Sequence, residues 1–160
     1  MPAPERYPEQ ELLRNLAGEW DCENWMMMDP SQPAMTSKGT MRSRLQTPNE
    51  YWVIADYKSE MMGMAFSGHS IFGYDITLKK WVGTWIDSMA PIIMNSTAEW
   101  NPVTKTWTSW ADFIDPASEQ PMKFRMTTEV KSADNHFFTM YIVTPEGEFK
   151  NMTINYTRRK

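Results

Sequence analysis

The sequence predicts an all-β protein: a single antiparallel up-and-down β-barrel of about ten strands with a short N-terminal helix. Three observations predict it. After Gly18 the apolar residues follow a period of two, and turn residues separate the apolar runs at hairpin spacing. No helical pattern interrupts these runs, which argues against parallel βαβ units. A meander this long has two exposed edges, and closure into a barrel removes them. A two-sheet sandwich is the main alternative.

The helix is expected directly after a Pro-rich N-terminal arm, residues 1–8. Leu12, Leu13 and Leu16 share one face at helical spacing, and Gly18 is placed to end the helix. The remaining chain, residues 9–160, shows no linker and no internal repeat, and its length suits one domain.

The strands are expected between clear turn signals such as Asp29-Pro30, Asn101-Pro102 and Asp115-Pro116. The predicted strands are 19–28, 36–46, 50–59, 65–75, 80–87, 92–101, 106–115, 122–132, 136–144 and 148–158. Alternation places Trp85 and Asp87 on one face of the fifth strand, and Phe66 on the apolar face of the fourth. Met126 alternates cleanly with charged residues. Several other strands are apolar on both faces, so their inward side stays open.

Composition excludes several classes of partner. The net charge is −4, and the only basic cluster is Arg158-Arg159-Lys160, so we expect no nucleic-acid partner. No stretch is apolar enough for a membrane span, and the N-terminus carries no apolar signal region. The single Cys22 cannot form an internal disulfide and is expected to be a buried structural thiol. We therefore expect a cytoplasmic protein.

No metal or other cofactor is expected. His69 and His136 are the only histidines, and no spacing typical of a metal site surrounds them. An exposed ring in a turn is the expectation for His136.

Eight Trp and 15 Met are the two compositional excesses. Trp offers a large rigid surface and Met an adaptable one, so together they suit the wall of a cavity. They suit an ordinary core equally well. The candidate ligand-binding residues are Trp52, Met62, Met64, Phe66, Trp85, Asp87, Met126 and Tyr141.

Three functions follow from this pattern. The first is a binding protein that holds a small hydrophobic or amphipathic molecule among Trp, Phe and Met, oriented by Asp87 or Tyr141. The second is an enzyme on the same barrel, with Asp87 or Glu60 as its proton-transfer group. The third is a barrel filled by side chains that acts through protein contacts or as a homodimer.

The segment Gly18-Glu19-Trp20, directly after the expected helix, resembles the signature of the calycin superfamily of lipocalins and fatty-acid-binding proteins. The resemblance implies that Trp20 plugs one end of the barrel. It also implies that a basic residue of the last strand, Arg158 or Arg159, covers the indole, a cation stacked on an aromatic face.

A second resemblance runs through the middle of the chain. The segments Phe72-Gly73-Tyr74-Asp75 and Lys80-Trp81-Val82-Gly83-Thr84-Trp85-Ile86-Asp87-Ser88-Met89 look like the bacterial domain of unknown function 1579. The similarity extends from about Leu12 to the closing Asn155-Tyr156-Thr157-Arg158. It implies a lipocalin-like fold and brings no established activity.

Overall fold

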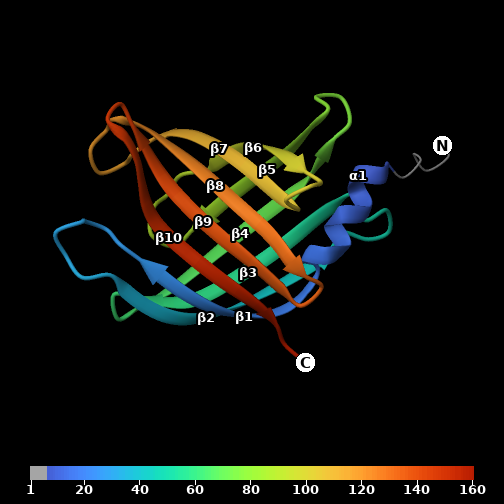
Figure 1. The fold of residues 1–160 in the computed structure, drawn as a ribbon, viewed down its shortest axis with the longest axis horizontal. Coiled ribbons are helices and arrows are strands. Elements are labelled where there is room, and N and C mark those ends of the chain that lie inside the picture. The colour runs from blue at the N-terminus through green and yellow to red at the C-terminus, as the bar shows by residue number, and fades with distance from the viewer. Residues whose placement is uncertain (1–6) are drawn as a thin grey trace.

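The computed structural model describes residues 7–160, which form a closed antiparallel barrel with one helical segment at its end (Figure 1). The first part of the expected N-terminal arm, residues 1–6, lies outside the described residues. The helix α1 spans Pro8–Glu11 and continues as a 3₁₀ helix, η1, over Leu12–Leu16. Proline suits the first turn of a helix because it has no N–H to donate there.

Ten strands follow, and each begins and ends close to the predicted limits. They are β1 Gly18–Met26, β2 Met35–Leu45, β3 Trp52–Met61, β4 Met64–Asp75, β5 Lys80–Asp87, β6 Met94–Asn101, β7 Thr106–Ile114, β8 Pro121–Ser132, β9 Asn135–Thr144 and β10 Gly147–Arg158. Each strand pairs with its neighbour in sequence, and β1 pairs with β10 to close the ring. The predicted up-and-down barrel is confirmed, and the two-sheet sandwich is wrong, because closure leaves no separate second sheet.

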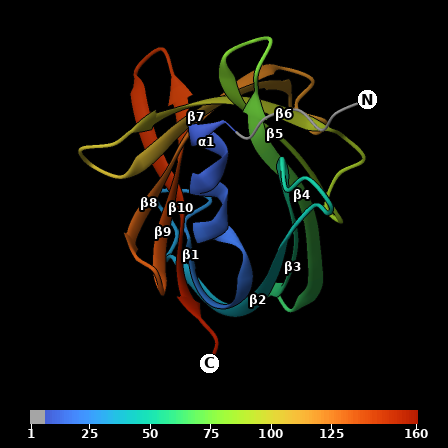
Figure 2. The ribbon, with the colours of Figure 1, turned by 90° about the vertical axis from the view of Figure 1, so that its right-hand side faces the viewer.

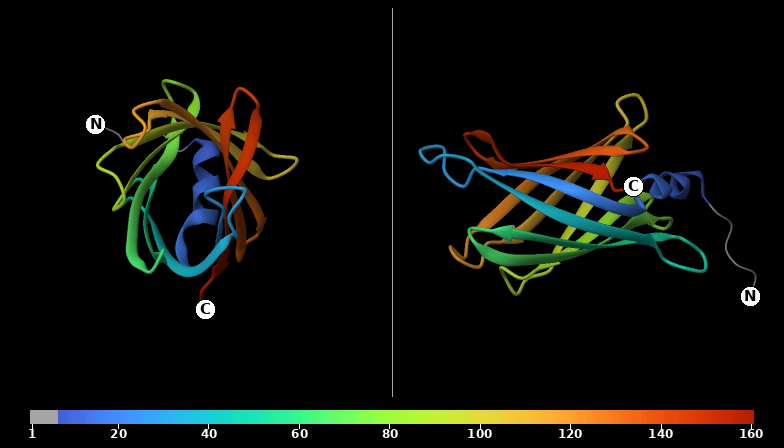
Figure 3. Two further views of the ribbon diagram at one scale, coloured as in Figure 1. Left: turned by 90° about the vertical axis from the view of Figure 1, so that its left-hand side faces the viewer. Right: turned by 90° about the horizontal axis from the view of Figure 1, so that it is seen from below.

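The barrel has two different ends because antiparallel neighbours place successive turns at opposite ends. At the end that we call the helix end, α1 and η1 lie across the ring of strands (Figure 2). The turns there comprise residues 46–51, 76–79, 102–105 and 133–134. The opposite end, which we call the mouth, carries the turns of residues 27–34, 62–63, 88–93, 115–120 and 145–146. Seen from the mouth, the helical segment lies behind the ring of strands (Figure 3).

The helix end is filled by side chains. Leu13 of η1 is completely buried and packs with Val53, Trp81, Ala98 and Trp107, all of them almost inaccessible. The Trp107 ring lies 5.4 Å from Trp81, edge to face. The apolar face predicted for the helix therefore packs into the barrel and closes its helix end.

The inner face of strand β9 becomes more accessible toward the mouth. Its inward residue nearest the helix end, His136, is 2% exposed. Phe138, Met140 and Ile142, further toward the mouth on the same face, are only partly buried. An inward side chain of a closed barrel keeps accessible surface only where the lumen itself is accessible. No helix within residues 7–160 is long and apolar enough to cross a bilayer.

Candidate ligand site in the barrel lumen

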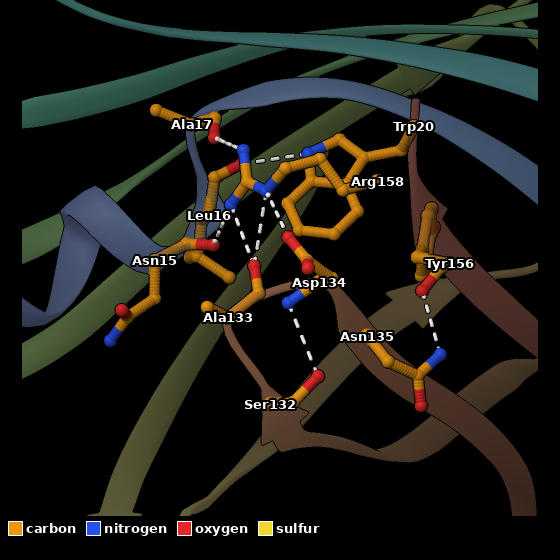
Figure 4. Close-up of polar contacts among 10 residues, drawn as sticks. All are labelled: Asn15, Leu16, Ala17, Trp20, Ser132, Ala133, Asp134, Asn135, Tyr156 and Arg158. Atoms are coloured by element: carbon orange, nitrogen blue, oxygen red, sulfur yellow. Dashed lines mark hydrogen bonds and ion pairs between the residues drawn. The ribbon is translucent and has the colours of Figure 1, made fainter. Parts of the chain in front are cut away.

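Trp20 and Arg158 seal the lumen at the helix end (Figure 4). The guanidinium carbon of Arg158 lies 4.2 Å from the centre of the Trp20 ring, and Trp20 is fully buried. Arg158 Nη1 donates a 2.7 Å hydrogen bond to the Ala17 carbonyl, and Nη2 donates one of 2.9 Å to Ala133. The plug is thus tied to both the helical segment and the β8–β9 turn.

Gly18 has a direct steric reason to be glycine. Its φ is +138°, and a Cβ at this position would overlap Nη1 of Arg158. Any side chain here would push the guanidinium off the indole. The segment Gly18-Glu19-Trp20 therefore supplies the plug, Trp20, and also leaves space for the Arg158 guanidinium that covers it.

His136 lies beside this plug rather than in an exposed turn, so the expectation of an exposed ring is wrong. The centre of its ring lies 4.3 Å from that of Trp20, with the two planes tilted by 36°, because alternation places His136 on the inner face of β9, where it is the register partner of Tyr156. Burial, with Arg158 nearby, lowers the pKa of His136 to about 4. Its Nε2 has no hydrogen-bond partner. The ring is therefore neutral at physiological pH.

The inner wall of the barrel is lined mainly by methionine and aromatic side chains. Alternation with buried neighbours places these methionines on the inner faces of their strands: Met26, Met35, Met41, Met61, Met94, Met122, Met126, Met140 and Met152. Phe113 and Phe124 add a ring pair at 4.8 Å. Thioether side chains adapt to the shape of an apolar guest at little cost.

One carboxylate, that of Asp87, sits on this wall. Tyr57, Gly68 and Asp87 are direct register partners on β3, β4 and β5, so they form a row across the inner face. Trp85 lies one inward position from Asp87, and its Nε1 donates a 2.7 Å hydrogen bond to Asp87 Oδ2. The other carboxylate oxygen, Oδ1, accepts a 2.8 Å bond from the Met89 amide.

Aromatic rings surround Trp85. Its indole occupies the space that a side chain at position 68 would need, which explains the glycine there. Phe66 stacks on Trp85 with 6.5 Å between ring centres, and Tyr57 lies 6.4 Å away. Phe66 and Tyr57 are buried, whereas Trp85 and Asp87 keep accessible surface. The carboxylate and the indole are thus the groups that a ligand can reach.

Neutral polar groups lie on the adjoining strands β10 and β1–β3. Tyr57 donates a 2.7 Å hydrogen bond to Asn24 Oδ1, and Asn24 Nδ2 donates to Ser37. Burial raises the pKa of Tyr156 well above its usual value, and it raises that of the Cys22 thiol to about 12. These groups stay uncharged and serve as hydrogen-bonding partners rather than nucleophiles.

The candidate ligand-binding residues predicted from the sequence lie in three places: on the inner face, at the mouth and on the outer face. Phe66, Trp85, Asp87 and Met126 lie on the inner face. Met62, in the β3–β4 turn, and Met64, at the start of β4, are each 54% exposed and lie at the mouth.

Three of the candidate residues, Trp52, Glu60 and Tyr141, point outward. Trp52 and Glu60 alternate with the buried Val53, Ala55 and Tyr57 of β3, so both face solvent. Glu60 therefore lies outside the lumen, which leaves Asp87 as the candidate proton-transfer group inside it.

Tyr141 also lies outside. It is the register partner of Arg125, whose guanidinium carbon lies 4.2 Å above the Tyr141 ring. Arg125 in turn pairs with Glu148 at 2.6 Å. Tyr141 thus belongs to an outer-wall cation–π pair.

The outer wall carries an apolar hollow of its own over β3–β5. Trp52 lines it together with Ile54, Ile71 and Val82. Because β3 is apolar on this outer face as well, alternation alone could not decide which of its faces points into the lumen. Tyr57 was therefore not predicted as a lumen residue.

The described residues, 7–160, contain no group of three His, Cys, Asp or Glu side chains close enough to hold a metal ion. The arrangement supports non-covalent binding of an apolar molecule with one anchored polar end.

Comparisons with known proteins agree with the fold. A family model described as "Protein of unknown function (DUF1579)" matches residues 5–158. No curated protein matches the sequence. Among solved structures, the S-type phycobiliprotein lyase CPES from Guillardia theta is similar with a TM-score of 0.64 and 11% identity. The match covers 97% of this chain and 94% of that chain. A likeness at this identity concerns the fold alone.

Proposed function

The chain belongs to the DUF1579 family, and because that description names no activity, we propose from the barrel itself that it binds a small hydrophobic or amphipathic ligand. The ligand lies in the mouth half of the lumen. One observation carries the proposal: on the inner face of β9, His136 at the helix end is 2% exposed, whereas Phe138, Met140 and Ile142 toward the mouth keep accessible surface.

The chemistry of the wall supports the same function. Binding sites for small molecules combine an apolar lining with a few placed polar groups. Here methionine and phenylalanine form the lining, and Asp87 with Trp85 is the placed polar pair. The plugged helix end makes the mouth the route of entry. A cytoplasmic setting and a homodimer remain predictions.

Native mass spectrometry of the purified protein is the first test, followed by mass analysis of the same sample after denaturing extraction. A ligand held in the lumen gives a mass excess that disappears on denaturation. The extracted molecule then identifies the ligand directly.

A matched pair of variants locates the site with the neutral dye Nile red. Ile142 points inward near the mouth, and its neighbour Val143 points outward. We expect Ile142→Trp to fill the lumen and abolish dye binding, whereas Val143→Trp retains it. Equal dye binding by both variants, or no binding by the unmodified protein, would contradict a lumen site.

A further inference from the structure

Few charged side chains lie on the inner wall, and the acidic and the basic one lie toward opposite ends of the barrel. On the inner faces of β1–β10, all of which the structure describes, the only acidic side chain is Asp87 and the only Lys or Arg is Arg158. Arg158 is engaged at the helix end by Trp20, Ala17 and Ala133. The accessible half of the lumen therefore presents one carboxylate and no basic group.

The turns around the mouth have the same sign. They contain Asp29, Asp115, Glu119 and Glu146, and the five described turns there include no Lys or Arg. Hydrogen bonds from neighbouring serines lower the pKa of Asp29 and of Asp115, so both stay ionised at neutral pH. A rim of one sign concentrates oppositely charged ligands and speeds their entry.

The two ends of the barrel differ in this respect. The turns at the helix end carry both signs, because Lys79 and Lys105 lie there together with Glu50 and Asp134. The acidic character of the mouth is therefore more than a reflection of the net charge of −4.

The Asp87 site has the composition of an ammonium site. A carboxylate supplies the opposite charge, and the accessible Trp85 indole, backed by Phe66, supplies an electron-rich ring face. Indole is the most favourable ring for a cation, and clustered aromatic side chains are the usual receptors for quaternary ammonium groups. The Met-rich wall beyond it accommodates an apolar tail.

We propose that the ligand is an organic cation, an apolar amine or quaternary ammonium compound whose charged end lies against Asp87 and Trp85. This inference rests on the proposed lumen-binding function and narrows it to one ligand class. An anionic amphiphile such as a fatty acid is disfavoured, because its headgroup would meet Asp87 and find no basic partner in the accessible half.

The test compares three octyl compounds with one tail and different headgroups: octyltrimethylammonium, octanol and octanoate. Binding to the full chain is measured by isothermal titration calorimetry. We expect the cation to bind about tenfold more tightly than the alcohol, with octanoate weakest. Asp87→Asn keeps the shape and removes the charge. It should lower affinity for the cation about tenfold and leave octanol unchanged.

Asp112→Asn is the matched control, because Asp112 lies on the outer face of β7, 3.7 Å from Lys123. It removes one negative charge without touching the lumen and should not change the cation preference. Octanoate binding as tightly as the cation, or no effect of Asp87→Asn, would overturn the cation assignment. Octanol binding without that preference would leave the lumen function standing. If none of the three compounds binds, both proposals are wrong.

Discussion

Trp85 and Asp87 hold each other on the inner face of β5 through a 2.7 Å hydrogen bond from the indole nitrogen to the carboxylate. The indole can reach this position because the register partner of Asp87 on β4 is Gly68, which has no side chain to occupy the space. The orientation of the lumen carboxylate therefore depends on a missing side chain on the neighbouring strand.

Gly68→Ala is expected to displace the Trp85 ring, because the added Cβ would overlap the ring. We expect a loss of about 1–3 kcal/mol in the free energy of unfolding and weaker binding of octyltrimethylammonium. Urea unfolding and calorimetry measure the two effects. Gly83→Ala is the control, since its closest neighbour at 2.9 Å is the Ser96 hydroxyl, which can rotate away. Equal losses in both variants would mean that Gly68 has no special role.

Arg158→Met is expected to destabilise the protein by about 2–4 kcal/mol. The change removes the cation from the Trp20 ring and leaves the Ala17 and Ala133 carbonyls without their donors. Arg159→Met provides the comparison, because Arg159 pairs with the exposed Asp21 on the outer surface. Exposed pairs contribute about 1 kcal/mol or less. Denaturant unfolding that ranks the two variants equally would contradict the role of Arg158 as cover of the plug.

His136 makes the stability depend on pH. Its pKa in the folded state is about 4, below its ordinary value of 6.5, so the unfolded chain binds a proton more readily. The free energy of unfolding is therefore unaffected above pH 6.5 and falls as the pH drops from 6.5 toward 4. The full loss amounts to about 3 kcal/mol.

His136→Phe should flatten this slope, measured by urea unfolding across the same pH range. His69→Gln is the control variant, since it replaces the other histidine, which is exposed and pairs with Asp56. An unchanged slope in His136→Phe would show that other groups carry the pH dependence.

Much of the fold could be predicted from local sequence. Turn residues and alternation located every strand, and the Gly18 to Trp20 signature pointed to the plug. The inner face was predictable where the opposite face is polar, as in β8, in which Lys123, Arg125 and Glu129 alternate with apolar residues.

The candidate site was only partly predictable because some outer faces are also apolar. Trp52 and Ile54 on the outside of β3 look more like core residues than the small inward Ala55 does. The acidic mouth was missed for a different reason. In an antiparallel meander, every second turn lies at the same end of the barrel. The acidic residues of the mouth form a group only when the turns are sorted in this way, which the sequence alone allows.

The ladder between β1 and β10 joins the first strand of the barrel to the last. Asp21 and its partner Arg159 are 138 residues apart in the chain. During translation, β1 must therefore wait with an unpaired edge until β10 has left the ribosome, and contacts this distant in sequence form slowly. The ring and its seal therefore form together, only once β10 is available, so a chain that lacks β10 has no enclosed interior in which to capture a ligand.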